Sequence, residues 1–349
     1  MDPTGKYPIP NVAVFPVTGA LPPIATGSAT CPTVPPGVLR TAANGSISIA
    51  ASGDAVEVVA QIGKWRAVAN VTTGCQPASV TIKLPGSASS TASVPAIAVS
   101  TGNADTLECA LHRMGIDGAV TVFQGAGGAT ATGAKPSSML WASAASLGAY
   151  DAILLSCEGA ATTGANPAGL SSYAQAGGMV FAEHWQYSYF DAAPFTSQGI
   201  ATWTTGANFL TGTTNSAILE APAAAGLQQW LPAGVLVNSE LPLTNMEAAH
   251  NATLGTASSL EIAADPTSSA PGAPLLFSWS EGGAGSAGGR IVYADFHIGS
   301  SSADYGTALG STMVPAGATY PTGCVAETAL EPAELVFLYT LFEDLSCGL

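Results

Sequence analysis

The chain has 349 residues, of which only 9% are charged, against roughly 25% in an ordinary soluble domain. It has 8 Lys and Arg against 23 Asp and Glu, a formal net charge of −15. So few cations cannot neutralise a run of phosphates or hold the chain on an anionic bilayer, which excludes nucleic-acid and membrane-surface binding. No apolar run reaches about 18 residues, so we predict no membrane span.

Residues 1–93 have the pattern of a small β domain. A turn at the N-terminus leads into a strand that ends near Phe15, and short alternating runs separated by Gly, Pro and Asn follow it. Such runs are typical of strands in a sandwich. We predict strands at 46–49, 55–62, 65–68 and 80–84, and a Gly/Ser/Ala-rich linker at 85–93.

From residue 94 the pattern changes to apolar strands alternating with helices, which predicts an α/β domain whose parallel sheet has helices on both faces. Asp105 is expected to cap the first helix, with Glu108 completing a capping box. The region at about 190–288 interrupts the rhythm and is interpreted as a β-rich insertion. The expected strands are at 96–100, 119–123, 150–156, 177–182 and 290–296, with 234–237 and 275–279 in the insertion. The expected helices are at 107–114, 139–147, 168–176 and from Pro332.

Two short motifs in the first segment resemble carboxypeptidase regulatory-like domains. One is Asp-Pro-Thr-Gly-Lys at 2–6 followed by Pro-Ile-Pro-Asn-Val-Ala-Val at 8–14, and the other is the strand–turn–strand pattern at 41–47. The resemblance implies a non-catalytic Ig-like or transthyretin-like β-sandwich over residues 1–93. The chain starts at the turn that follows the first strand of such a module, so the sandwich is expected to be incomplete.

Three stretches of the second segment, at 150–159, 173–180 and 289–293, resemble the class I glutamine-amidotransferase-like superfamily, especially its trehalose-utilisation-protein-like branch. This resemblance implies a flavodoxin-like sheet over residues 94–349. Amidotransferases carry G-x-C-x-G at the nucleophile turn. Here Cys157-Glu158-Gly159 matches the second half of that motif, and Leu155 stands in place of the first glycine. The whole chain resembles bacterial secreted or cell-surface proteins that join these two modules.

An even number of cysteines without a C-x-x-C pair favours disulfides in an oxidising compartment over a zinc ribbon. We expect the pairs Cys31–Cys75 and Cys324–Cys347, because each lies within one segment. A Cys109–Cys157 disulfide is the alternative to a free thiol at Cys157. The first residues carry no signal peptide, so a secreted or cell-surface protein whose leader is absent from this sequence is expected. The six cysteines are Cys31, Cys75, Cys109, Cys157, Cys324 and Cys347.

Ionisable side chains follow the ends of several predicted parallel strands, where open α/β sheets bind their ligands. They come in four pairs along the chain. The pairs are Asp105 with Glu108, Cys157 with Glu158, Glu183 with His184, and Asp295 with His297.

Two chemistries are open for this rim. In one, Cys157 is a nucleophile with His184 as its base, or His184 and His297 perform acid–base work oriented by Glu183 or Asp295. In the other, His184, His297 and Asp295 bind a divalent metal such as zinc, with a further carboxylate of the rim. That metal is the one cofactor that the rim residues indicate.

A third reading is a binding site without chemistry. Trp185, Tyr187 and Tyr189 form an aromatic cluster after the fourth predicted strand. Aromatic faces beside carboxylates suit sugars, so a surface polysaccharide is a candidate partner. The carboxylates of this candidate binding site are Glu158, Asp105 and Glu108. The alternative is that the rings pack in the core.

As the first function we expect a non-enzymatic surface or assembly protein, because an incomplete sandwich can accept a strand from a partner or from a second copy. The second expectation is a secreted hydrolase that cleaves an ester, amide or glycosidic bond with the rim residues. The third is a carbohydrate-binding module.

Overall fold

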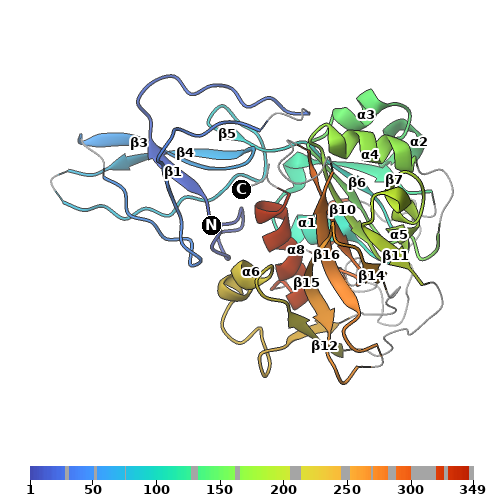
Figure 1. Ribbon diagram of the computed structural model, residues 1–349. Helices are drawn as coiled ribbons and strands as arrows, with labels where there is room; N and C mark the ends of the chain where they lie inside the picture. The colour runs from blue at the N-terminus through green and yellow to red at the C-terminus, as the bar shows by residue number, and fades with distance from the viewer. Residues whose placement is uncertain are drawn as a thin grey trace.

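In the computed structural model the chain is a mixed α/β protein (Figure 1). The structure describes residues 1–27, 31–50, 53–74, 76–126, 133–161, 166–204, 214–244, 252–268, 270–281, 288–299, 320–325 and 329–345. These residues form a five-stranded sheet, a ten-stranded sheet and a two-stranded sheet. The α/β class predicted for the second segment is therefore present, together with a separate β layer from the first.

The N-terminal segment forms one antiparallel sheet in the order β2-β1-β3-β4-β5. Its strands are β1 (Ala13–Pro16), β2 (Leu39–Arg40), β3 (Ala55–Ile62), β4 (Trp65–Thr72) and β5 (Ala92–Ser93). The strands predicted at 46–49 and 80–84 are wrong, since neither stretch is a strand. Ile47, Ile49 and Ile82 pack against the core. The alternating isoleucines thus mark a face of the chain that packs on the core. Within the described residues these stretches do not form the backbone hydrogen bonds of a sheet.

The ten-stranded sheet runs β13-β12-β15-β16-β17-β10-β9-β6-β7-β8. From β17 to β8 all neighbours are parallel, and from β13 to β17 all are antiparallel. The parallel part is β6 (Ile97–Ser100), β7 (Val120–Gln124), β8 (Lys135–Pro136), β9 (Ala152–Leu155), β10 (Met179–Glu183) and β17 (Arg290–Ala294). Because these strands are parallel, their carboxyl ends share one rim of the sheet.

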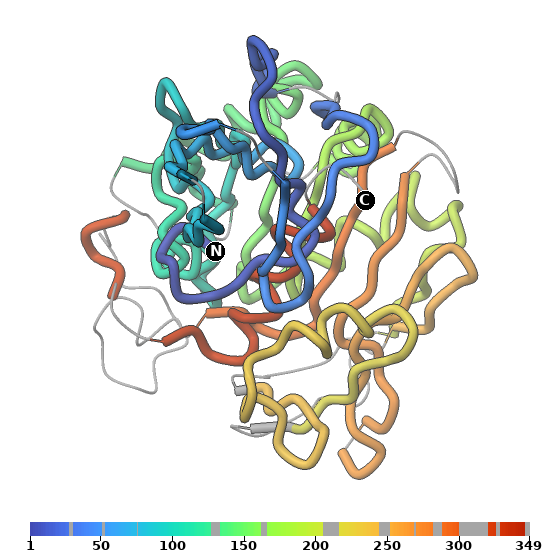
Figure 2. The backbone as a smooth tube through the Cα atoms, turned by 90° about the vertical axis from the view of Figure 1, so that its left-hand side faces the viewer, coloured from blue at the N-terminus to red at the C-terminus, as the bar shows by residue number. Residues whose placement is uncertain are grey.

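The region predicted as an insertion extends this sheet instead of forming a separate unit. It supplies the antiparallel strands β12 (Thr214–Leu219), β13 (Leu241–Thr244), β15 (Ser259–Ala264) and β16 (Pro274–Ser280). It also supplies β11 (Ala201–Trp203) and β14 (Ala252–Leu254), which pair with each other. The strand predicted at 234–237 is wrong, because only an isolated bridge between Val237 and Glu240 is present there. In Figure 2 the yellow and orange part of this region lies below the N-terminal segment.

Helices cover both faces of the large sheet. On the face toward the N-terminal sheet lie α1 (Leu107–Arg113) and α8 (Pro332–Glu343), and on the other face lie the helices from α2 to α5 (Figure 1). The latter are α2 (Ser137–Leu140), α3 (Ala144–Gly148), α4 (Pro167–Gln175) and α5 (Tyr187–Phe190), while α6 (Ala225–Trp230) lies beside α8. Short 3-10 turns lie at Asp117–Ala119, His184–Gln186 and Phe195–Ser197. No helix in the described part of the chain has the length and apolarity to cross a membrane.

Helix α8 joins the two main sheets. Phe337 packs on Phe181 of the large sheet and Phe342 on Trp65 of the N-terminal sheet, each with ring centroids 4.7 Å apart. Nearly every residue of the helix is buried, and most of them are apolar, as expected of a helix that packs between two layers.

Buried carboxyl groups gather where α8 ends. Arg290 is shared between Glu261 at 3.2 Å and Asp344 at 3.1 Å. Burial raises the pKa of Asp344 to about 7; Glu261 adds to this rise and Arg290 opposes it. Burial also raises the pKa of Glu343 to about 6, although Asn11 Nδ2 donates to its Oε2 at 2.7 Å.

This cluster predicts that stability falls as pH rises. A carboxyl whose pKa is higher in the folded state binds more protons when folded, so the free energy of unfolding decreases between about pH 4 and pH 7. Asp344→Asn should remove about 2–4 kcal/mol of that decrease. Urea unfolding between pH 4 and pH 8 measures the free energy of unfolding as a function of pH. Asp54→Asn, at an exposed position, is the control. Equal pH slopes for Asp344→Asn and the unmodified protein would contradict the prediction.

Candidate functional site

Three side chains that follow neighbouring parallel strands meet at the rim. Cys157 comes after β9, His184 after β10 and His297 after β17. The Cys157 Sγ and the His297 Nε2 each lie 3.2 Å from the same atom, His184 Nδ1. The ligand atoms of these three residues lie within 4.8 Å of one another, and all three residues are buried. The sequence predicted each of them as a rim residue, and the structure brings them together.

The backbone of His184 is strained. Its φ is +42°, in the left-handed region that side chains other than glycine rarely adopt. The Tyr293 hydroxyl donates to the His184 carbonyl oxygen at 2.6 Å, and Gln186 Nε2 donates to the Ser156 carbonyl oxygen at 2.6 Å. These bonds tie the turn after β10 to β17 and to the turn after β9. Strain of this kind persists where the surroundings over-determine it, which is typical of functional sites.

A buried pair of carboxyl groups lies under the same turns. Asp105 accepts hydrogen bonds from the backbone N–H groups of Ile298 at 2.6 Å and Gly299 at 2.9 Å. Glu183 Oε2 accepts from the Cys157 N–H at 3.2 Å. Burial raises the pKa of Glu183 well above its ordinary value, and the neighbouring Asp105 raises it further. Burial and the neighbouring Asp105 thus both favour the neutral form of the Glu183 carboxyl.

The expected capping box on the first helix is wrong. The N-cap of α1 is Thr106, which makes no side-chain capping bond. The Asp105 carboxylate is instead directed to the segment that carries His297. Gly102 permits this close packing, because a Cβ there would collide with the carbonyl oxygens of Cys157 and Asp105.

Burial of the Cys157 thiol disfavours its nucleophilic thiolate form. Burial raises its pKa well above the ordinary value. Hydrogen bonds from the backbone N–H groups of Trp185 and Gly159 oppose this rise, whereas Glu183 and Asp105 add to it. Reactive thiols have the reverse property, a depressed pKa in an electropositive and partly exposed setting.

The geometry also differs from a catalytic relay. In a nucleophile–base–orienter triad the base uses one ring nitrogen for the nucleophile and the other for the orienting group. Here the Cys157 sulfur and the His297 nitrogen both approach Nδ1 of His184. The three donor atoms lie within 4.8 Å of one another, an arrangement that could hold a cation.

The other predicted rim residues serve neighbouring contacts. Asp295, predicted as the carboxylate ligand, lies with its Oδ1 2.9 Å from the Tyr293 hydroxyl. The third member of the ligand group is Cys157 in its place. Glu158 is buried beside Gly125, where an added Cβ would collide with its carboxylate. Glu108 is buried on α1, and its charge acts on Tyr320 near the disulfide described below.

The predicted aromatic cluster is mostly core. Tyr187 and Tyr189 are buried in the hydrophobic cluster that includes α4 and α5, and Tyr187 packs on Trp203 with ring centroids 5.3 Å apart. Trp185 is half-buried and packs at the edge of this cluster. Of the three rings, only Trp185 keeps a substantial exposed surface for a ligand.

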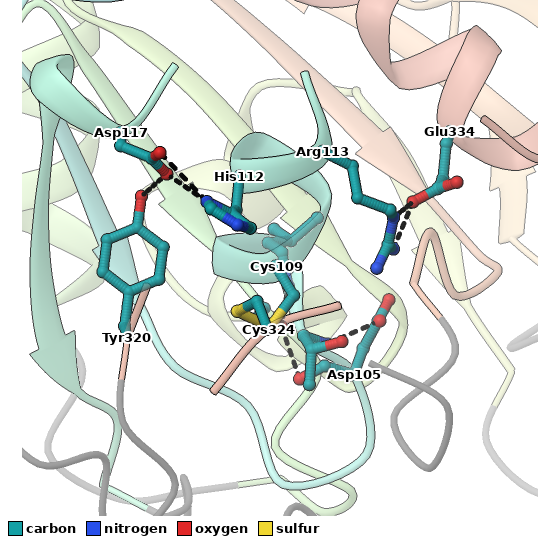
Figure 3. The surroundings of a disulfide bond; sticks show 11 residues. Asp105, Cys109, His112, Arg113, Asp117, Tyr320, Cys324 and Glu334 are labelled. Atoms are coloured by element: carbon teal, nitrogen blue, oxygen red, sulfur yellow. Dashed lines mark hydrogen bonds and ion pairs between the residues drawn. A yellow bond between two sulfur atoms is a disulfide. The ribbon is translucent and has the colours of Figure 1, made fainter. Parts of the chain in front are cut away.

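The disulfide pairing differs from the prediction. Cys109 of α1 is bonded to Cys324, 215 residues away in the chain (Figure 3). Cys157 is a free thiol. The predicted pairs Cys324–Cys347 and Cys109–Cys157 are therefore wrong. Cys31 is disulfide-bonded, and its expected partner Cys75, like Cys347, lies outside the described residues. Closeness in sequence failed as a guide because the fold brings the segment after β17 back onto α1.

Other contacts of α1 flank the bridge in Figure 3. On one side the Tyr320 hydroxyl donates to Asp117 Oδ1 at 3.0 Å, and that carboxylate also contacts His112 Nδ1 at 2.8 Å. On the other side Arg113 Nε donates to Glu334 of α8 at 2.6 Å. Helix α1 thus anchors both the 320–325 segment and α8.

Two residues of the site were not anticipated from the sequence. Tyr293 lies inside β17 and Gln186 inside the turn after β10, so neither follows a strand end. Tyr293 alternates with the apolar residues of a buried strand, and a buried tyrosine hydroxyl needs a partner. That need was the only signal available.

The comparisons with known proteins leave the family open. No protein-family model matches the chain, and no curated protein matches it. Among solved structures, an exo-β-1,4-mannosidase from an Opitutaceae bacterium aligns with 10% sequence identity and a TM-score of 0.32. The alignment covers 59% of this chain and 32% of the mannosidase. A similarity this low carries no argument about fold or activity.

The cysteine arrangement predicts a specific chemical map. Non-reducing peptide mapping should recover the linked peptides of Cys109 and Cys324, and iodoacetamide should modify Cys157 only after denaturation, because the Cys157 side chain is fully buried. Breaking the bridge with Cys109→Ala plus Cys324→Ala should lower the free energy of unfolding by about 2–5 kcal/mol. Rapid alkylation of native Cys157, or a Cys109–Cys157 peptide, would contradict this arrangement.

Proposed function

We propose that this chain binds a zinc-class metal ion through Cys157, His184 and His297. Tetrahedral zinc with ordinary bond lengths places its sulfur and nitrogen ligands about 3.6 Å apart and two nitrogens about 3.4 Å apart. The two distances to His184 Nδ1 are 3.2 Å, within a few tenths of an ångström of those values, and the third pair, Cys157 Sγ and His297 Nε2, lies within 4.8 Å and has to close by about 1 Å around an ion. This convergence of three donor atoms is the observation that carries the proposal.

The donor types favour zinc or copper. A thiolate and imidazoles bind these soft or borderline ions, whereas calcium and manganese prefer carboxylate and carbonyl oxygens. Metal binding requires the Cys157 thiol to lose its proton, so metal affinity should rise with pH. The Asp105–Glu183 pair supports the site indirectly, since it holds the turns that carry the ligands.

Three ligands in the described residues leave the fourth tetrahedral position for water or substrate, the pattern of catalytic zinc sites. Bound zinc lowers the pKa of its water to near neutrality and so supplies a nucleophile. We therefore propose metal-assisted hydrolysis of an ester, amide or glycosidic bond as the reaction class.

Cobalt titration tests the metal proposal. The metal-free protein should bind one equivalent of Co²⁺ and show the intense sulfur-to-cobalt absorption of a thiolate ligand. Cys157→Ser should lose that band, and His297→Ala should weaken binding by at least tenfold. His112→Ala is the matched control, because His112 contacts Asp117 beside the disulfide and not this site. Binding without a thiolate band, or equal binding by Cys157→Ser, would contradict the assignment.

A more specific description of the two segments is also part of the proposal. We propose that residues 1–93 are an incomplete Ig-like sandwich and residues 94–349 a flavodoxin-like domain of the amidotransferase-like kind. The parallel run from β17 to β8 with helices on both faces supports the second part. The Cys109–Cys324 bridge supports a secreted or cell-surface location, because disulfides persist in oxidising compartments.

A second function, self-assembly through the N-terminal sheet, is supported by the edge of β4. One side of β4 pairs with β3 along its whole length, and on the other side β5 is the only described strand. The last hydrogen bond toward β5 runs from the Val68 N–H to the Thr91 carbonyl oxygen, so residues 69–72 have no described strand on that side. Because N–H groups alternate along a strand, those of Asn70 and Thr72 also point to this edge. The edge residues 68–72 carry no Lys or Pro, the usual protection against pairing.

Asn70→Pro tests assembly. Proline removes one outward N–H and leaves the bonds to β3 in place, so any oligomer formed through this edge should dissociate to monomer. Asn70→Ala changes the same side chain but keeps the N–H, and it should assemble like the unmodified protein. Light scattering coupled to size exclusion measures both. A protein that is monomeric at all concentrations rejects the assembly function.

A further inference from the structure

The N-terminal sheet has a cavity on the face that points away from α8. Trp65, on the α8 side, packs on Phe342, whereas its neighbour Arg66 points to the opposite face. There the chain segments 15–22 and 33–36 and the Arg66 side chain line a cavity of about 480 Å³ that is partly open to solvent. This volume lies within the range of small-molecule sites. None of the residues around it belongs to the metal site.

Arg66 is buried beside this cavity without a carboxylate. It is 6% exposed. Its Nε donates to Gln61 Oε1 at 2.8 Å and its Nη1 donates to the Pro22 carbonyl oxygen at 2.7 Å, both neutral acceptors. A guanidinium has five N–H donors, so most of its hydrogen-bonding capacity is unused within the described part of the chain.

The two other buried cations behave differently. Lys64 lies 2.5 Å from Asp151, and Arg113 is paired with Glu334. A buried charge is expensive unless an opposite charge compensates it, and 23 acidic residues were available for this purpose. Burial also lowers the pKa of Arg66, with no carboxylate to offset that effect. The missing counter-ion of Arg66 therefore has to come from outside the described chain.

The walls define the rest of the ligand. The lining is rich in apolar side chains, among them Phe15, Val17, Leu21, Pro22 and Pro35. It contains one cation and no acidic residue, so it suits a single negative charge on an apolar body. The planar fork of a guanidinium matches a carboxylate in particular.

We propose that this cavity binds a carboxylate carried on an apolar stem, with Arg66 as its counter-ion. The carboxylate occupies the unused donors of the guanidinium, and the stem lies against the proline and aliphatic side chains. The carboxylate comes either from a free organic acid or from the C-terminus of a peptide.

Calorimetric titration with matched probes tests the proposal. Phenylacetate should bind at least tenfold more tightly than its neutral isostere phenylacetamide, and Arg66→Met should abolish that preference. Arg290→Met is the matched control, because Arg290 lies on the large sheet, and it should keep the preference. Equal binding of the two probes by the unmodified protein, or an unchanged preference in Arg66→Met, overturns the proposal.

Two further measurements separate a ligand site from a structural role. Arg66→Met should unfold at the same or a higher temperature than the unmodified protein, whereas Arg113→Met should unfold at a lower temperature because it leaves Glu334 buried alone. If Arg66→Met fails to fold, the Arg66 Nε–H resonance of the unmodified protein decides the question by NMR. A shift with phenylacetate and not with phenylacetamide supports the ligand site, and no such shift shows that the role of Arg66 is structural. Comparing phenylacetate with acetyl-Pro-Leu carboxylate and its amide then identifies the source, and binding of neither carboxylate rejects the site.

Discussion

The carboxylate of Asp105 organises the rim of the large sheet. It accepts hydrogen bonds from two backbone N–H groups of the segment after β17. It also lies beside Glu183 at the end of β10 and raises the pKa of that carboxyl, which accepts the N–H of Cys157 after β9. One buried carboxyl pair thus fixes the ends of three strands relative to one another. Buried carboxylates need hydrogen-bond donors, and here the donors are backbone N–H groups of the segments that carry Cys157 and His297.

Charge is scarce in this chain, and much of the positive charge is used inside the molecule. Lys64 joins the N-terminal sheet to Asp151 before β9, Arg113 joins α1 to α8, and Arg290 serves two carboxylates at the end of α8. The pairs of Lys64 and Arg113 are buried. Buried pairs add little net stability, but losing one partner is costly, so they define how segments dock. Arg66 differs from these cations because its hydrogen-bond acceptors within the described residues are neutral, and this lack of a carboxylate partner is the basis for proposing an anionic ligand.

The proposed metal site, the β4 edge and the Arg66 cavity lie in different parts of the molecule and are inferred from different physical observations. Convergent lone pairs indicate a cation, unpaired backbone groups indicate a strand, and an uncompensated guanidinium indicates an anion. The α8 helix, buried against both sheets, holds these surfaces in a fixed relation.

The sequence by itself determined the alternation of strands and helices after residue 94 and the chemical identity of the rim, because burial of apolar strands and the parallel order follow from local periodicity. It placed Cys157, His184 and His297 at strand ends correctly but left their roles open. Only the tertiary structure decided that both other ligand atoms approach His184 Nδ1, that Asp105 supports a distant loop and caps no helix, and that Cys109 pairs with Cys324. These are contacts between segments far apart in the chain, and no local pattern encodes which of several equally polar partners the fold brings within 3 or 4 Å.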